Sequence, residues 1–200
     1  MHAGNGHMWA ATLCAAFVLP PLFLGQPGPA SPKRGQTPEQ EDHRQYEARH
    51  RALQAQAKQV FDTEMAREKA GDCLDAKTDY DFNVCFGKQL TITDQNLKSY
   101  EGFIRELMAP PPQMPGQSAA ETNPKANGIA GPVLSPPEFE HEFERVEQSW
   151  EQYRDVACAA AFHQFDGGTG GPSFQLECKL KLARDHMREL SMIYGGELRL

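Results

Sequence analysis

The first thirty residues contain no Lys, Arg, Asp or Glu. Within them, residues 9–24 form an apolar run, which the small-residue stretch 28–30 follows. This outline is typical of a secretory signal peptide. A retained membrane anchor is the weaker interpretation, because the run is shorter than the ~20 residues that span a bilayer and Pro20 and Pro21 interrupt it. We therefore expect residues 1–30 to be cleaved after Ala30.

Closely spaced cysteine pairs are also missing, which argues against a structural zinc site. Removal of residues 1–30 takes away Cys14 and leaves Cys73, Cys85, Cys158 and Cys178. An even number of cysteines in an exported chain predicts two disulfides. Three connectivities can be drawn. Short loops favour Cys73–Cys85 and Cys158–Cys178, and each bridge is expected to stabilise the fold by about 3 kcal/mol.

Catalytic motifs are absent as well. The chain has no H-E-x-x-H, G-x-S-x-G or C-x-x-C-H sequence, and we expect neither an enzyme nor a cofactor or metal site. The histidines beyond residue 30 are scattered through charged segments: His43, His50, His141, His163 and His186.

Acidic residues outnumber basic ones, 27 to 20, and every charge lies beyond residue 30. A net charge of −7 argues against a nucleic-acid partner. An acidic surface would speed encounter with a basic protein, but ordinary solubility explains this charge equally well.

A flexible linker is expected at residues 31–40, followed by an N-terminal helical extension at 41–70, where Pro and Gly are absent. The apolar stripe of this helix is thin, so we expect it to lie on a larger element. A coiled coil for oligomerisation is the alternative. The stripe consists of Tyr46, Leu53, Ala57, Val60, Phe61 and Met65.

The second predicted helix starts with a capping box formed by Thr78 and Asp81 and ends before Pro110. Residues 109–134 lack apolar periodicity, and we interpret them as a disordered insertion, with a proline-rich ligand for a partner as the alternative. The apolar positions of the helix follow steps of three and four: Phe82, Phe86, Leu90, Thr93, Leu97, Tyr100, Ile104 and Leu107.

The third predicted helix opens at Ser135, with Pro136 at its first position, Glu138 completing a capping box, and Leu134 and Phe139 forming a hydrophobic staple. It runs to about Phe165. Its inward stripe is Phe139, Phe143, Val146, Trp150, Tyr153, Ala157 and Ala160.

The fourth predicted helix runs from about Ser173 to Tyr194, where Gly195 and Gly196 end it. A tail, 195–200, follows. The inward positions of this helix are Leu176, Leu180, Ala183, Met187 and Leu190.

No segment beyond residue 30 is predicted to be a strand, so the fold class is all-α: a disulfide-stapled helical bundle. We expect the second and third helices to form a long antiparallel pair, with the first and fourth packed alongside. This arrangement brings Cys85 and Cys158 to the same end of the bundle, close to Cys73 and Cys178.

Four short motifs lie at or near the cysteines: Asn83-x-Cys85 with Asp94 and Leu97 downstream, Trp150-x2-Tyr153-Arg154-Asp155-x2-Cys158, Gly167-Gly168-Thr169, and Cys178 with Leu190. Together they make residues 71–194 resemble the lysozyme inhibitor LprI-like family of bacterial secreted domains. The resemblance implies a helical, exported domain, and it suggests noncovalent inhibition of a lysozyme by occlusion of its saccharide cleft.

Most of these motif residues have a structural interpretation. We expect Trp150 and Tyr153 to pack in the core, and Arg154 and Asp155 to point away from it and pair with the last helix or a loop. The turn at 167–171 is the candidate partner contact, because a flexible loop tethered by a disulfide binds at reduced entropic cost. A plain helix connection is the default for that turn, which comprises Gly167, Gly168, Thr169, Gly170 and Gly171.

Two functions from different classes follow. The first is a periplasmic or secreted lysozyme inhibitor that protects peptidoglycan. The second is a non-inhibitory structural or adaptor protein that binds another component of the cell envelope. Neither has a nucleic-acid partner, a cofactor or a membrane span that remains after signal cleavage.

Overall fold

The computed structural model describes residues 37–109 and 135–198. They form four helices, α1 (Pro38–Ala70), α2 (Asp79–Leu107), α3 (Pro136–His163) and α4 (Gly171–Leu198), and contain no strand. The all-α prediction is confirmed. None of the four helices is long and apolar enough to cross a membrane. The expected signal peptide, most of the linker and all of the predicted insertion 109–134 except Ala109 lie outside the described residues, and so does the staple residue Leu134.

Reciprocal capping sets the starts of α1 and α2. Thr37 and Gln40 exchange side-chain-to-backbone hydrogen bonds of 3.2 and 3.4 Å, so α1 begins at Pro38, three residues before the predicted start. Thr78 and Asp81 form the predicted capping box, with hydrogen bonds of 3.1 Å in each direction. Each cap satisfies backbone amides that the first turn leaves free and contributes about 1 kcal/mol.

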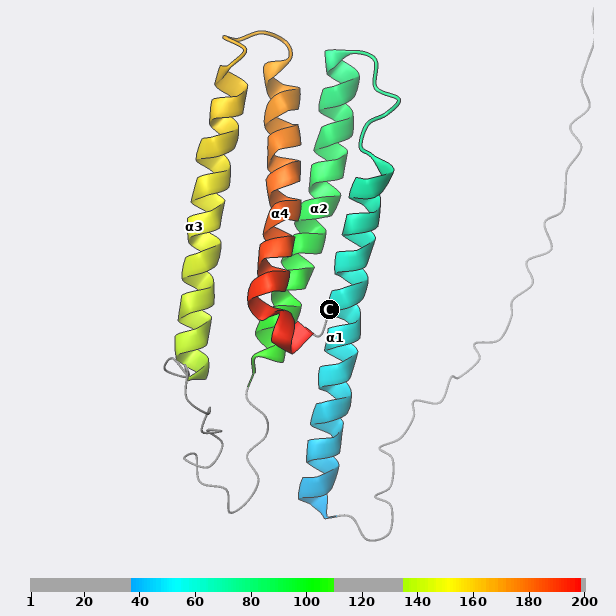
Figure 1. The fold of residues 1–200 in the computed structure, drawn as a ribbon, viewed down its shortest axis with the longest axis vertical. Coiled ribbons are helices and arrows are strands. Elements are labelled where there is room, and N and C mark those ends of the chain that lie inside the picture. The colour runs from blue at the N-terminus through cyan, green and yellow to red at the C-terminus, as the bar shows by residue number, and fades with distance from the viewer. Residues whose placement is uncertain (1–36, 110–134, 199–200) are drawn as a thin grey trace, which may run out of the picture. The chain divides into compact units, whose positions relative to one another are not determined.

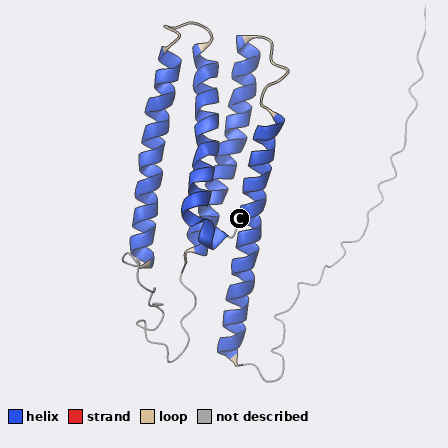
Figure 2. Cartoon of the chain, viewed as in Figure 1, coloured by secondary structure: helices blue, strands red, loops and turns tan. Residues whose placement is uncertain are grey.

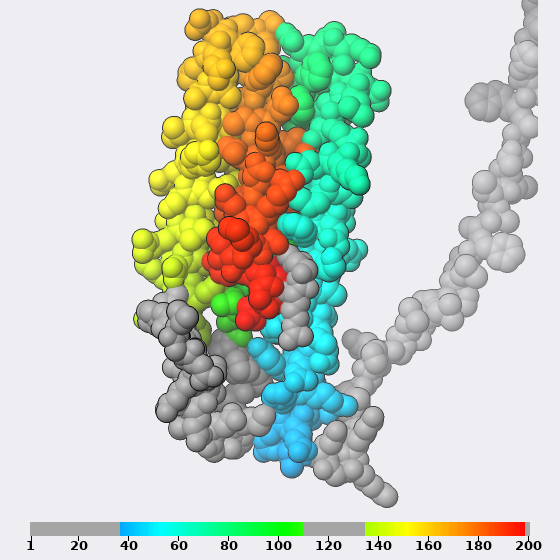
Figure 3. Space-filling view, viewed as in Figure 1, coloured from blue at the N-terminus to red at the C-terminus, as the bar shows by residue number. Residues whose placement is uncertain are grey.

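At the start of α3, the Ser135 amide donates to Glu138 over 2.7 Å, as predicted. The end of α4 differs from the prediction, because the helix continues through Gly195 and Gly196 to Leu198. Leu198 is buried in the core, and its burial outweighs the cost of about 1 kcal/mol for each helical glycine. The last turns of α4 cover the face between α1 and α3 (Figure 3).

Helices α1 and α3 run in one direction and α2 and α4 in the other (Figure 1). Helix α4 packs most extensively against α2 and next against α3. Helix α1 packs on α2 and, less extensively, on α4. The predicted principal pairing of α2 with α3 is therefore wrong. Those two helices are joined mainly by side chains, including an ion pair of 2.9 Å between Asp94 and Arg154. Figure 2 shows that only short loops connect α1 to α2 and α3 to α4.

Helix α1 belongs to the same hydrophobic core as the other three helices. Its Leu53 and Ala57 are buried there, and Val60, Phe61 and Met65 pack against the cluster, so the thin stripe is covered by other helices of the same chain. This agrees with the expectation that the helix lies on a larger element. The buried cluster comprises Leu53, Ala57, Leu97, Tyr100, Ile104, Leu107, Phe143, Ala183, Met187, Leu190 and Leu198.

Candidate functional site

The loops that join α1 to α2 and α3 to α4 lie at one end of the bundle (Figure 1). Both disulfides are near these loops. One joins Cys73, in the segment 71–78, to Cys85 on α2, with a Cα–Cα distance of 5.8 Å. The other joins Cys158 on α3 to Cys178 on α4, with a Cα–Cα distance of 5.5 Å. Both predicted pairings are confirmed. We call this part of the molecule the disulfide end.

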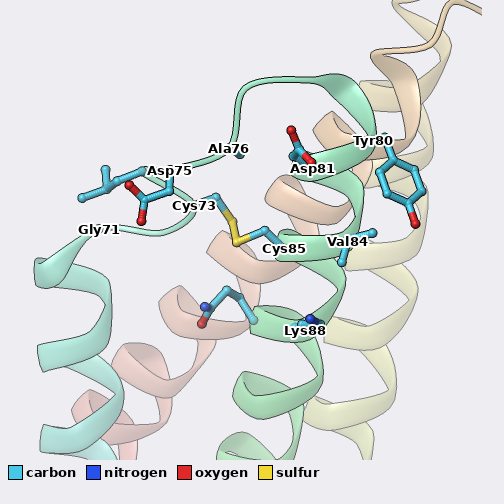
Figure 4. A pocket seen from close by; sticks show the side chains of 11 residues that line it. Gly71, Cys73, Asp75, Ala76, Tyr80, Asp81, Val84, Cys85 and Lys88 are labelled. Carbon is cyan, nitrogen blue, oxygen red and sulfur yellow. A yellow bond between two sulfur atoms is a disulfide. The ribbon is translucent and has the colours of Figure 1, made fainter. Parts of the chain in front are cut away.

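The segment 71–78 leaves α1 through two residues with left-handed backbone conformations. Gly71 has a φ of 86°, and its amide donates to the Glu68 carbonyl over 3.0 Å, which closes the helix. Cys73 has a φ of 57° and is held by its disulfide. This sharp turn exposes Leu74, whose relative accessibility is 76%. Figure 4 shows the segment tied to α2 by the disulfide.

Two hollows of about 540 and 570 Å³ flank this segment, and both are lined by Cys73, Leu74 and Ala76. The first extends along one face of α2, where Tyr80, Val84 and Lys88 stand on successive turns (Figure 4). The second extends to the start of α4. Its other lining residues are Asp72, Asp79, Phe82, Phe86, Ser173, Phe174 and Glu177.

Large apolar side chains are exposed around both hollows. Leu74 and Tyr80 are about three-quarters exposed, and Val84 and Phe174 are exposed to a lesser degree. Asp75 and Glu177 add carboxylates to the linings. Exposed apolar side chains bordered by polar ones are typical of surfaces that bind another protein. We call Leu74, Tyr80, Val84 and Phe174 the apolar patch.

The glycine turn lies beside this surface. Its Thr169 hydroxyl is hydrogen-bonded to the carboxylate of Asp79 at the start of α2. Gly167, with a φ of 81°, is exposed, as is Gly168, whereas Gly171 is buried. A Cβ on Gly171 would lie 3.2 Å from the ring of Phe162, so close packing explains that glycine. Partner contact by the turn stays a prediction, and the exposed residues 167–169 are the part open to it.

The motif on α3 forms a column of stacked side chains. The Arg154 guanidinium lies 4.5 Å from the centre of the Trp150 ring, whose other stacking partner is His186 on α4, at 4.1 Å between ring centres. Arg154 also donates to Asp94 on α2 over 2.9 Å. The family motif therefore joins α2, α3 and α4, which agrees with a packing role for Trp150.

The predicted positions of Tyr153 and Arg154 are wrong. Tyr153 is 60% exposed, whereas the Arg154 side chain is mostly covered and pairs with α2 rather than with the last helix or a loop. After Trp150, the next inward-facing residue on α3 is Arg154, four positions later, and not Tyr153, three positions later. The step is favourable because the arginine stem packs on the indole while its charge is paired.

The remaining motif residues support the fold. Asp155 accepts a hydrogen bond from Lys179 over 2.9 Å, as expected for a pair with the last helix, and this bond lowers the pKa of Asp155. Leu97 and Leu190 are buried in the core. Asn83 is half-buried, and its Oδ1 has no hydrogen-bond partner among the described residues.

Sequence reasoning did not identify the apolar patch. Tyr80 and Val84 are four residues apart on α2 and lie off its inward stripe. This spacing indicates a second apolar face of the helix and could have predicted part of the patch. Leu74 and Phe174 carry no such signal, because each lies in or next to a loop and only the folded chain brings them together.

Comparison with known proteins gives one match. A family model described as lysozyme inhibitor LprI matches residues 70–190, more than half of the chain. The matched range includes both disulfides and every motif residue, and it leaves out nearly all of α1. No curated protein and no solved structure matches.

Proposed function

The chain belongs to the lysozyme inhibitor LprI family, and from that premise we propose that it inhibits a lysozyme noncovalently and so protects peptidoglycan. The family match is the observation that carries the proposal. This family is one of inhibitors rather than enzymes. Two disulfides suit a protein that acts outside the reducing cytoplasm, in the periplasm or after secretion.

The disulfide end offers a suitable contact surface. Its segment 71–78 is fixed by Cys73–Cys85 and by the cap at Thr78, so little conformational entropy is lost when it binds. The exposed Leu74 and Tyr80 can act as apolar anchors in a concave site such as a saccharide cleft. The proposed mode of inhibition is occlusion of that cleft.

The charge of the protein is compatible with a basic partner. The protein carries a net charge of −7, and the hollows beside the apolar patch are lined by the carboxylates of Asp75 and Glu177. Opposite charge on a basic lysozyme would raise the association rate, and added salt would lower it.

A second candidate is an adaptor role in the cell envelope without lysozyme affinity. Tyr153 and Val156 favour it, because both are exposed, apolar and separated by three residues on α3, away from the hollows of the disulfide end. Such a pair can contact an apolar groove of another protein.

The test is inhibition of lysozyme-driven lysis of cell walls by the purified, oxidised protein, with several lysozyme classes and with a reduced sample as control. Inhibition that is lost on reduction supports the proposal. If the oxidised protein has no effect on any class at concentrations of roughly 100 µM, which corresponds to binding weaker than about −5.5 kcal/mol, the adaptor role becomes the better account.

A further inference from the structure

A cluster of three titratable side chains lies between α2, α3 and α4, away from the disulfide-end hollows. Glu101, Glu147 and His186 each bring a potential ligand atom, and these atoms all lie within 4.8 Å of one another. His186 and Glu147 are buried, and Glu101 is half-buried. Each of the three comes from a different helix, so the bundle itself holds the group together.

The orientation of His186 resembles that of a metal ligand. Its Nδ1 lies 3.2 Å from a carboxylate oxygen of Glu189, and its Nε2 lies 3.2 Å from both carboxylate oxygens of Glu147. The stacked ring of Trp150 fixes the imidazole plane. A carboxylate that hydrogen-bonds one ring nitrogen while the other faces the ion is the usual arrangement behind metal-bound histidines.

Electrostatics at the cluster favour a cation. Burial, and then the negative charge of Glu147, raise the pKa of Glu101 to about 8. Glu151 adds a further negative charge, and only Arg105 opposes the effect. The Arg105 Nε lies 3.2 Å from Glu140, so that cation is shared with another carboxylate.

The other buried carboxylate of the bundle, Glu64, shows the contrast. Burial alone would raise its pKa, but hydrogen bonds from Arg184, Thr93 and Asn96 lower it below its usual value. Glu64 therefore has its counter-charge within the protein. The basic neighbours of Glu101 and Glu147 are the imidazole of His186, 3.2 Å from Glu147, and Arg105, which also pairs with Glu140.

We propose that Glu101, Glu147 and His186 bind a divalent transition-metal ion, with Zn²⁺ as the preferred ion. One imidazole nitrogen and two carboxylates suit zinc, whereas Mg²⁺ and Ca²⁺ prefer oxygen ligands alone. Zinc–ligand bonds of about 2.0–2.2 Å require the ligand atoms to lie closer together than their present limit of 4.8 Å, so binding would include a side-chain adjustment. A fourth position is left for water. The ion would clamp α2, α3 and α4 together.

The test uses the full, oxidised protein after treatment with a chelator, titrated with ZnCl2 by calorimetry and then with Co²⁺ by visible spectroscopy. We expect one ion per chain with micromolar or tighter affinity, a higher melting temperature, and the visible absorption of four-coordinate Co²⁺. Mg²⁺ at the same concentration should leave the melting temperature unchanged.

Variants assign the ion to these residues. Glu101→Gln, at the half-buried position, and His186→Gln should each weaken zinc binding at least tenfold, with helical circular dichroism retained. The matched control, His141→Gln, alters an exposed histidine on α3 and should leave zinc binding unchanged. The proposal is overturned if the wild-type protein binds no Zn²⁺ at about 100 µM, or if Glu101→Gln binds it as tightly as wild type. If the wild-type protein binds no Zn²⁺, the three side chains form a hydrogen-bonded ion-pair cluster without a metal.

Discussion

Arg184 on α4 donates a hydrogen bond from Nε to Oε1 of Glu64 on α1 over 2.8 Å, and both side chains are buried. Glu64 accepts two further hydrogen bonds of 2.7 Å, from Thr93 and Asn96 on α2. The other end of the guanidinium pairs with Asp72. This network is fully satisfied at its centre, and it joins α1 to the two helices on which it packs. Helix α1, although almost wholly outside the family match, is thus an integral part of the bundle.

Replacing Glu64 with Ala should destabilise the protein by about 1–3 kcal/mol, because the buried Arg184 keeps its pair with Asp72 but its Nε loses its acceptor. Urea denaturation of the oxidised protein measures the change. The control is Asp62→Ala, which removes the exposed ion pair of Asp62 with Lys58 and should cost less than about 1 kcal/mol. If the two variants lose the same free energy of unfolding, the buried network stabilises the protein no more than an exposed ion pair does.

The metal-free protein should lose stability as the pH rises from about 4.5 to about 8, because of Glu101. Its pKa is raised in the folded state, so the folded protein binds more protons than the unfolded chain throughout this window, and raising the pH favours unfolding. The charged groups around it are Glu147, Glu151, Glu189, Arg105 and His186.

Since Glu101 is partly exposed, the loss should amount to about 1–2 kcal/mol. Denaturation midpoints measured across the window in the presence of a chelator give the slope. Glu101→Gln should be less sensitive to pH than wild type over the same range. An identical pH dependence in the two proteins would show that Glu101 is not the group responsible.

Each disulfide should contribute about 3 kcal/mol, because the closed loops, with sequence separations of 12 and 20, are of similar length. The double variants Cys73→Ala/Cys85→Ala and Cys158→Ala/Cys178→Ala separate the two contributions by urea denaturation. If the proposed contact surface is correct, the first variant should also weaken lysozyme inhibition more than the second does, since Cys73–Cys85 holds the segment that carries Leu74.

Leu74→Asp should weaken lysozyme binding at least tenfold without affecting stability, because it places a charge in the exposed apolar patch. The matched control is Met192→Asp on the distal half of α4, where Met192 is as exposed as Leu74. Surface plasmon resonance with immobilised lysozyme compares the two. Unchanged binding by Leu74→Asp would exclude the disulfide end as the contact surface.

Local sequence signals predicted most of the fold. The capping boxes at Thr78 and Ser135 set helix starts through contacts within three residues, and the loop lengths between cysteines selected the disulfide pairing. The motif around Trp150 identified the family. The predicted end of α4 at Gly195 failed, because burial of Leu198 outweighs the weak helix propensity of glycine.

By itself, the sequence determined the helices, the disulfides and the family, since each depends on residues close together in the chain or on a fixed pattern of them. Only the tertiary structure decided that α4 rather than α3 is the main neighbour of α2, and that Arg154 rather than Tyr153 turns inward. It alone brought Glu101, Glu147 and His186 together. The physical reason is that packing between helices far apart in sequence depends on side-chain fit and charge pairing, which periodicity does not encode.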